Sequence, residues 1–199
     1  MADDLPELLL PDADAWRAWL AEHHTQPTGV WLALHKKGGD VTSLTYVQAV
    51  EEALCVGWID GQARRRDEGS SFQRMTPRRA RSAWSAVNVE RVERLEREGR
   101  MQDAGRAQVA AAQADGRWES AYRGPATIEM PEDLAAALAQ DPAAQRWFDA
   151  LTSANRFAIL LRVGQAKRPE TRARRIAGFV ADLAEGRTPY PQKRRPDGV

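Results

Sequence analysis

The sequence is poor in the residues that build covalent or metal-bound frameworks. Its 199 residues include one cysteine, Cys55, and three histidines. A single cysteine excludes an intramolecular disulfide framework and is typical of a reducing compartment. His23, His24 and His35 form no pattern with the spacing of metal ligands. We therefore expect no metal site.

Long apolar runs and an excess of one charge are also missing. No window approaches the roughly 18 apolar residues that a membrane helix requires. The start, MADDLPELLLPDADAW, carries two aspartates where a signal peptide would carry basic residues. The 29 basic and 28 acidic residues leave a net charge of +1, so no global field attracts nucleic acid or a membrane surface. We expect a soluble, cytoplasmic protein that does not insert into membranes.

Common cofactor machinery is absent as well. The sequence contains no Gly-rich phosphate loop and no G-x-S-x-G nucleophile motif. Serines occur without a plausible histidine partner, which makes a serine nucleophile a weak hypothesis. We expect no bound cofactor.

The patterns that are present predict a small sheet with helices in the first part of the chain. Residues 12–25 have the apolar spacing of a helix behind an Asp cap, and residues 29–37 are apolar on both alternating sets, as in an inner strand. Thr45 and Gln48 stand at capping-box spacing before a helix that runs to about Val56. Two alternating segments on either side of Asp67-Glu68-Gly69 predict an antiparallel hairpin.

After Pro77 the patterns are helical. Ser85 or Asn88 can cap a helix with a narrow apolar stripe, and a second helix is predicted over about 103–115. Residues 123–131 are typical of a linker. Four further helices are predicted beyond it, at about 131–140, 143–151, 154–165 and 169–185.

The predicted fold class is α+β: a small antiparallel sheet of about three strands with packed helices, followed by an all-helical C-terminal subdomain. We expect an α+β domain over 1–124 and a helical subdomain over 125–188. The proline-rich, basic segment 189–199 is predicted to be a disordered tail.

Glu51 is the first candidate functional residue. At about 100° per residue, a helical wheel places Glu51 beside the apolar positions Val47 and Trp58, while Gln48 and Glu52 project elsewhere. A buried carboxylate needs a cationic or backbone donor, or else its pKa is raised. Glu51 is therefore either a partner in an ion pair that braces the hairpin or an acid, base or ligand acceptor in a cleft.

The first hairpin strand carries a polar row. Alternation places Asp60, Gln62 and Arg64 on one face, and Ile59, Gly61 and Ala63 on the other. The row is either a solvated face or part of a site in which Asp60 and Glu51 converge as paired carboxylates.

The stretch TPRRARSAWSAVN places arginines, serines and a tryptophan before a helix. The N-terminus of a helix offers free amides and a positive dipole end, which suit an anionic group. Capping together with a surface arginine cluster is the alternative. Cys55 lacks a neighbouring histidine or lysine, so we expect a buried, inert thiol.

Six stretches resemble the YdeI/OmpD-associated, or bacteriocin-protection, family: WLAEHHTQPTGVWLALHKK, LTYVQAVEEALCVGWIDG, TPRRARSAWSAVNVERVERLEREGRMQDAG, GRWESAY, AKRPETRARRI and FVADLAEGRTP. The resemblance implies a role in protection against bacteriocins or related stress. The family pattern falls on Lys37, Tyr46, Glu51, Ala53, Cys55, Gly57, Trp58, Asp60, Arg78, Ser82, Trp84, Ser85 and Asn88.

Three classes of function fit the sequence. The first is a non-catalytic protein that sequesters a small polar or peptide-like molecule in a Trp-lined polar cleft. The second is a cofactor-free hydrolase or isomerase with Glu51 or Asp60 as general base. The third and least favoured is nucleic-acid binding through the arginine clusters. The predicted ligand-binding residues are Lys37, Tyr46, Glu51, Trp58, Asp60, Arg78, Ser82, Trp84, Ser85 and Asn88.

Overall fold

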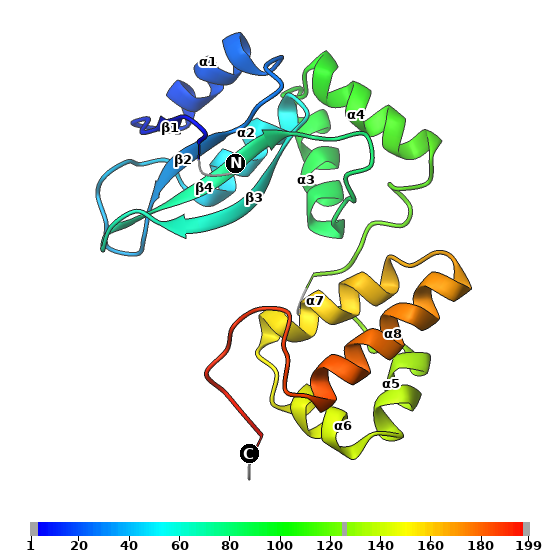
Figure 1. Cartoon of the computed structure of the whole chain (residues 1–199). Helices are drawn as coiled ribbons and strands as arrows, with labels where there is room; N and C mark the ends of the chain where they lie inside the picture. The colour runs from blue at the N-terminus through cyan, green and yellow to red at the C-terminus, as the bar shows by residue number, and fades with distance from the viewer. Residues whose placement is uncertain (1–3, 125–126, 197–199) are drawn as a thin grey trace. The chain divides into compact units, whose positions relative to one another are not determined.

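The chain forms two compact units, Met1–Ala121 and Tyr122–Val199 (Figure 1). The computed structural model describes residues 4–124 and 127–196. The predicted α+β class is confirmed: the first unit contains the sheet with four helices, and helices α5 to α8 belong to the second unit. Pro125 and Ala126, at the predicted domain boundary, lie outside the described residues.

The helices of the first unit begin at caps that the sequence predicts. The Asp12 side chain accepts a hydrogen bond from the Ala15 amide at 2.9 Å, and Thr45 and Gln48 form a complete capping box. Of the two candidate caps for the third helix, Ser85 is the one that caps it. The helices are α1 (Ala13–His23), α2 (Tyr46–Cys55), α3 (Ala86–Arg97) and α4 (Asp103–Ala114).

The sheet has four strands in the order β1-β2-β4-β3. The predicted inner strand β2 pairs in parallel with β1 and antiparallel with β4, and β3 and β4 form the predicted hairpin. The fourth strand, β1, contains two residues and is too short to leave a pattern in the sequence. The strands are β1 (Glu7–Leu8), β2 (Val30–His35), β3 (Trp58–Arg65) and β4 (Ser70–Pro77).

The predicted alternation of β3 is wrong because the strand contains an irregularity. Asp60 pairs with Met75 and Ala63 pairs with Gln73, so two residues of β3 stand opposite the single residue Arg74 of β4, and β3 contains one extra residue. Asp60 and Ala63 therefore lie on one face, and Arg64 lies on the other. The Gln73 amide donates to the carbonyl oxygen of Gly61 at 2.8 Å, which satisfies backbone that the ladder leaves unpaired.

One face of the sheet packs against α1 and α2 and forms the main core of the first unit. The residues of this core include Trp16, Leu20, Leu32, Ala53, Trp58 and Met75. A second apolar cluster lies between α2 and the helices α3 and α4. Because α2 is packed on both sides, every residue from Ala49 to Cys55 is buried.

Two glycines allow α4 to approach the end of α2. Gly57 follows α2 with φ of +79°, a backbone conformation that L-residues rarely adopt. A Cβ on Gly105, in the first turns of α4, would lie 2.3 Å from the carbonyl oxygen of Cys55. The backbone of α4 therefore rests directly on the last turn of α2.

The second unit is built from four helices around one apolar cluster that includes Leu134, Phe148, Ile159, Val163 and Leu183. The helices are α5 (Glu132–Ala139), α6 (Pro142–Asp149), α7 (Ser153–Gly164) and α8 (Pro169–Ala184), close to the predicted ranges. No helix in the described parts of the chain is long and apolar enough to cross a membrane.

The segment after α8, for which the sequence predicts disorder, is hydrogen-bonded to α7. Asn155 is fully buried, and its amide donates to the carbonyl oxygen of Tyr190 at 3.0 Å and to the side chain of Gln192 at 2.7 Å. The Tyr190 amide donates back to Asn155 at 2.7 Å. Residues 197–199 of the predicted tail lie outside the described residues.

The close contact at Gly105 gives a test of the packing between α2 and α4. We expect Gly105→Ala to lower the free energy of unfolding of the first unit by about 2 kcal/mol, because the new methyl group meets backbone that cannot rotate away. Denaturant unfolding followed by tryptophan fluorescence reports on this unit, since every tryptophan except Trp147 belongs to it.

Gly61→Ala is the matched control in the same unit. Its Cβ would lie 3.7 Å from the Arg74 side chain, an ordinary contact. We expect a change within about 0.5 kcal/mol. Equal stability of the two variants would contradict the close packing of α4 on α2.

Candidate functional site

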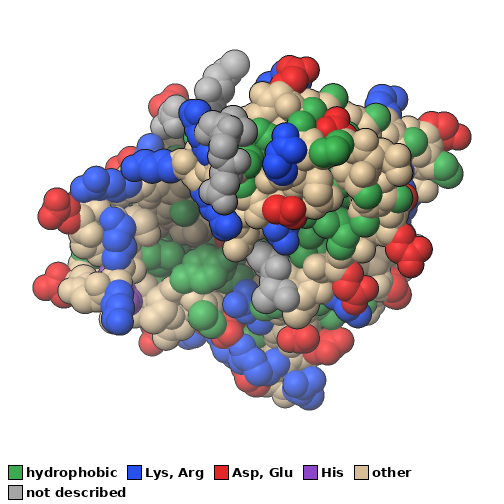
Figure 2. All heavy atoms as spheres, turned by 90° about the horizontal axis from the view of Figure 1, so that it is seen from below, with side chains coloured by type: hydrophobic (Ala, Val, Ile, Leu, Met, Phe, Trp, Pro, Cys, Tyr) green, Lys and Arg blue, Asp and Glu red, His purple; other side chains and the backbone are tan. Residues whose placement is uncertain are grey.

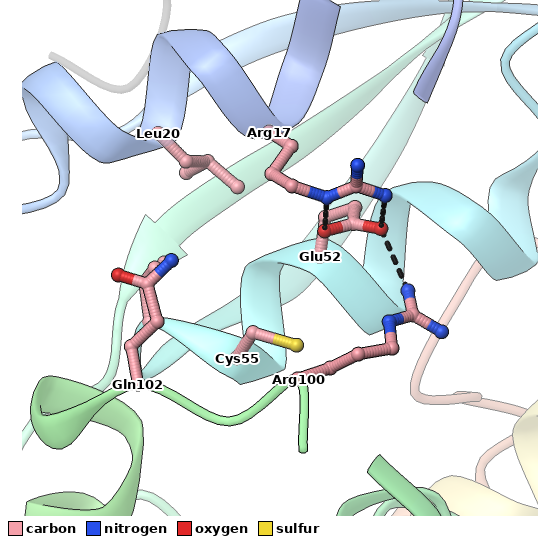
Figure 3. Close-up of a pocket in the computed structure, with 7 residues that line it drawn as sticks. Arg17, Leu20, Glu52, Cys55, Arg100 and Gln102 are labelled. Atoms are coloured by element: carbon pink, nitrogen blue, oxygen red, sulfur yellow. Dashed lines mark hydrogen bonds and ion pairs between the residues drawn. The ribbon is translucent and has the colours of Figure 1, made fainter. Parts of the chain in front are cut away.

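A pocket of about 360 Å³ lies where α1, α2 and the connection between α3 and α4 meet (Figure 3). Arg17 reaches it from α1, Glu52 and Cys55 from α2, and Arg100 and Gln102 from the connection. Figure 3 shows the two guanidinium groups on either side of Glu52, with Gln102 across the pocket from Arg100. Leu20 and Val56 complete the lining.

The carboxylate of Glu52 is the centre of this arrangement. Arg17 binds it with two hydrogen bonds, from Nε at 2.9 Å and from Nη2 at 2.7 Å, and Arg100 donates from Nη2 at 2.6 Å. The side chain of Glu52 is 4% exposed, whereas that of Arg17 is 49% exposed. A buried carboxylate therefore accepts a bidentate pair of hydrogen bonds from Arg17 and one charge-assisted hydrogen bond from Arg100.

The same contacts shift the pKa values of the two arginines. The hydrogen bond to Glu52 raises the pKa of Arg17 further above its usual value. Burial alone would lower the pKa of Arg100, but the charge of Glu52 and its hydrogen bond more than offset this and raise it overall. Both guanidinium groups consequently stay charged at any physiological pH.

Glu51, the neighbour of Glu52 on α2, extends the network to α3. It forms an ion pair with Arg94 of α3 and lies 3.6 Å from Arg100, and Arg94 also pairs with Glu98 at 2.8 Å. The prediction that Glu51 faces inward and meets an arginine agrees with these contacts, although the partners belong to α3 and the segment after it rather than to the hairpin.

The prediction that Glu52 projects away from the interior is wrong. Glu51 is 8% exposed and Glu52 is 3% exposed. A helical wheel assumes one buried face, but α2 is enclosed by α1 and the sheet on one side and by α3 and α4 on the other. Adjacent carboxylates on such a helix both become buried: Arg94 pairs with Glu51, Arg17 pairs with Glu52, and Arg100 contacts both.

Cys55 contributes a thiol to the pocket lining. Burial is the main reason that the pKa of Cys55 is raised to about 11, and the charge of Glu52 adds to the effect, while Arg100 and Arg17 oppose it. The thiol is therefore protonated at neutral pH and is a poor nucleophile, in agreement with the inert thiol expected from the sequence.

Gln102 provides the pocket with an uncommitted polar group. Its backbone amide donates to the carbonyl oxygen of Cys55 at 3.0 Å and fixes the connection against the end of α2. Its side-chain amide makes no hydrogen bond with any residue in the described ranges 4–124 and 127–196. This amide can both donate to and accept from a molecule in the pocket.

The structure brings some of the predicted site residues together in pairs. The Tyr46 hydroxyl donates to Asp60 at 2.7 Å, which joins the start of α2 to β3. The guanidinium of Arg78 stacks on Trp84, with Cζ 3.5 Å from the ring centroid, and Trp84 packs edge-on against Trp118.

Other predicted residues have local structural contacts. The Ser82 hydroxyl accepts from the Arg79 amide at 3.1 Å, the Ser85 side chain caps α3, and Asn88 accepts from Arg91 at 2.9 Å. These contacts fix the entry into α3.

Two predicted residues lie apart from the rest. Trp58 is fully buried in the core between the sheet and α1, where its indole donates to the carbonyl oxygen of His24 at 2.8 Å. Lys37 is exposed at the end of β2. Trp58 and Trp84 therefore belong to different apolar clusters, and a ligand-binding role for the predicted set stays a prediction.

Arg17, Glu52, Arg100 and Gln102 were missed by the reasoning from sequence. Arg17 and Arg100 come from segments that are distant along the chain from Glu52, and nothing in their local pattern sets them apart from surface arginines. The adjacent Glu51-Glu52 pair in an otherwise apolar helix was the one available signal. When a helix is packed on two sides, two neighbouring carboxylates on it cannot both point to solvent.

Comparison with known protein families gives two matches. Residues 8–108 match the model of a domain of unknown function (DUF8412), and residues 127–186 match the model described as bacteriocin-protection, YdeI or OmpD-associated. The first match spans just over half of the chain, so the chain belongs to the DUF8412 family. No curated protein and no solved structure matches it.

The second match confirms the resemblance to the bacteriocin-protection family for the C-terminal helices. Three of the resembling stretches, at 19–37, 44–61 and 76–105, fall within the region that the DUF8412 model covers, and GRWESAY at 116–122 lies beyond it. The pocket at Glu52 lies wholly in that region.

The pairing of Glu52 predicts a large loss of stability when its charge is removed. We expect Glu52→Gln to lower the free energy of unfolding of the first unit by about 2 kcal/mol. This loss is smaller than the cost of breaking a fully buried ion pair, because Arg17 is half exposed. Glu96→Gln, which breaks the exposed ion pair with Arg106, is the control and should change it by less than about 0.5 kcal/mol. Comparable losses in the two variants would show that the burial of Glu52 adds nothing.

The raised pKa of Cys55 predicts a loss of stability at high pH. Above about pH 9 the thiol ionises in the unfolded chain but stays protonated in the folded chain until about pH 11, so the free energy of unfolding falls across this window. We expect wild type to lose about 2 kcal/mol more than Cys55→Ala between pH 8.5 and 11, measured by denaturant unfolding at each pH. Parallel pH profiles would contradict the buried, protonated thiol.

Proposed function

We propose that this protein is a non-catalytic protection protein that binds and sequesters a small anionic molecule in the pocket around Glu52. The observation that carries the proposal is the set of donors in the lining: two guanidinium groups surround a single carboxylate. Outside the lining Arg17 also pairs with Asp14 at 2.8 Å and Arg100 with Glu98 at 3.2 Å, so the charges are balanced there. The guanidinium N–H groups that these pairs leave over are donors suited to a carboxylate or phosphate as the bound group.

The size and the other walls of the pocket support a small ligand. A volume of about 360 Å³ lies at the lower end of the range for small-molecule sites. Leu20, Val56 and Cys55 offer an apolar surface, and the Gln102 amide offers a hydrogen bond on the opposite side from Arg100 (Figure 3). A short organic anion with an apolar body suits this combination.

The state of the acidic groups supports binding rather than catalysis. Both oxygens of Glu52 accept hydrogen bonds from arginines, and Glu51 is paired with Arg94. Asp60 accepts from the Tyr46 hydroxyl. A carboxylate whose lone pairs are engaged by charged donors is a poor general base. The protonated thiol of Cys55 is likewise a poor nucleophile.

A thermal-shift screen of carboxylates, phosphate esters and acidic peptides, followed by calorimetry of the hits, tests the proposal. We expect Gln102→Trp, which fills the pocket and leaves every ion pair intact, to weaken a hit at least tenfold. Arg106→Gln alters an exposed ion pair outside the pocket and should leave the affinity unchanged.

Recovery of the bound compound distinguishes sequestration from catalysis. We expect mass spectrometry to return it unaltered after prolonged incubation with the protein. Conversion of the compound, or hits that bind the Gln102→Trp variant as tightly as wild type, would contradict the proposal. Survival of bacteria that produce either form during bacteriocin challenge then tests the protective role.

A further inference from the structure

The second unit contains a pocket of its own, between α7, α8 and the segment that follows α8. Its volume is about 340 Å³, at the lower end of the range for small-molecule sites. Arg162 reaches it from α7, and Phe179 and Asp182 reach it from α8. Thr188 and Pro189, from the segment after α8, form one wall. The pocket therefore offers charged groups and an aromatic ring to one small molecule.

The wall formed by Thr188 and Pro189 is held in place by hydrogen bonds. The Thr188 hydroxyl donates to the carbonyl oxygen of Tyr190 at 2.8 Å, and the Tyr190 amide donates to Asn155 at 2.7 Å. Asn155 is fully buried in α7, so the segment is anchored to the interior of the unit. A wall that is already fixed avoids the cost of ordering a segment when a ligand binds.

The charged groups lie at opposite ends of the pocket. The helices α7 and α8 lie side by side and run in opposite directions (Figure 1). Arg175, near the start of α8, donates to the carbonyl oxygen of Arg162 in the last turn of α7, whereas the segment after α8 bonds to Asn155 in the first turn of α7. Arg162 therefore lines one end and Asp182 the other, with Phe179 between them along α8.

Arg162 supplies a cationic group at its end of the pocket. Its side chain is exposed and makes no hydrogen bond or ion pair with any residue in the ranges 4–124 and 127–196. Arg175 adds a second positive charge nearby, since its guanidinium contacts the Arg162 carbonyl oxygen. A planar guanidinium can donate two parallel hydrogen bonds to a carboxylate, so this end suits the anionic group of a ligand.

Asp182 supplies an anionic group at the opposite end. Its Oδ1 atom accepts from Arg187, from Nε at 2.9 Å and from Nη2 at 2.8 Å, and the same arginine also pairs with Glu185. Two carboxylates thus share one guanidinium, and Oδ2 of Asp182 accepts no hydrogen bond within the described part of the chain. The Asp182 side chain is 49% exposed, so a ligand can reach it. A carboxylate accepts hydrogen bonds and cannot donate them, so this end suits an ammonium group.

The surface between the charged ends is apolar. Phe179 and Pro189 are half-buried, and the buried side chains of Ile159 and Leu183 complete the lining. Acidic and basic side chains are interspersed on the face of the molecule that Figure 2 presents, and the net charge is +1, so no field of one sign selects a simple anion or cation. A ligand with a single charge would meet a group of the same sign at one end of the pocket.

We propose that this pocket binds a small zwitterion whose two charges stand at opposite ends of an apolar body, as in a dipeptide with apolar side chains. The carboxylate accepts hydrogen bonds from Arg162, the ammonium group donates to Asp182, and the apolar body packs on Phe179. The site lies wholly in the second unit and does not depend on the function proposed for the pocket around Glu52.

A calorimetric titration of the full chain with leucyl-alanine tests the proposal, and we expect saturable binding of one molecule. Leucyl-alaninamide lacks the carboxylate, N-acetyl-leucyl-alanine lacks the ammonium group, and glycyl-glycine lacks the apolar side chains. Leucine attaches both charged groups to one carbon atom. We expect each of these four compounds to bind more weakly by about tenfold or more, because each loses one contact or the spacing of the charges.

Arg162→Met removes the guanidinium from an exposed position and keeps an apolar stem. We expect this variant to bind leucyl-alanine no more tightly than leucyl-alaninamide, since the group that distinguishes the two is gone. Arg146→Met, at an exposed arginine of α6 outside the pocket, should retain the wild-type preference. Gln102→Trp, which fills the pocket of the first unit, should leave leucyl-alanine binding unchanged and so separates the two sites.

Several outcomes would overturn the proposal. They are the absence of saturable binding, equal binding of all five compounds, and an Arg162→Met variant that still prefers leucyl-alanine to its amide. Loss of leucyl-alanine binding in Gln102→Trp would place the ligand in the first unit and would overturn it as well. The comparison of compounds is made on the wild-type chain, so it decides the matter whatever the stability of the variants.

Discussion

The burial of Glu52 between Arg17 and Arg100 is the interaction on which the arrangement of the first unit depends. It joins α1, α2 and the connection after α3 at one point, although the partners lie 35 and 48 residues from Glu52 along the chain. A carboxylate that is 4% exposed is tolerated only where charged donors engage it. The pairing therefore specifies which helices meet α2, and it places two arginines in the lining of the pocket as a consequence.

The sequence predicts most elements because their ends are chemically marked. Asp12, the Thr45–Gln48 capping box and Ser85 each stand where a helix begins. The alternating segments on either side of Gly69 predict the hairpin. These signals are local, since a cap or a turn is satisfied by residues a few positions away.

The features that the sequence does not predict depend on tertiary contacts. The irregularity in β3 changes the face on which Arg64 lies, and its carbonyl groups are satisfied by Gln73 from the neighbouring strand. The pairing of Glu52 requires arginines from two other segments. The predicted site residues were selected from one continuous region, and the structure distributes them: Tyr46 with Asp60, Arg78 with Trp84, and Trp58 in a separate core.

The hydrogen bonds between Asn155 and the segment after α8 limit which substitutions this sequence can accept. The amide of Asn155 donates to Gln192 and to Tyr190, and its oxygen accepts from the Tyr190 backbone, so the buried group is matched on every side. A change at Asn155 or at Gln192 alone leaves a polar group in the interior without its partner. Gln192 is therefore restricted by its buried partner: a substitution at one of the two positions is tolerated only with a matching substitution at the other.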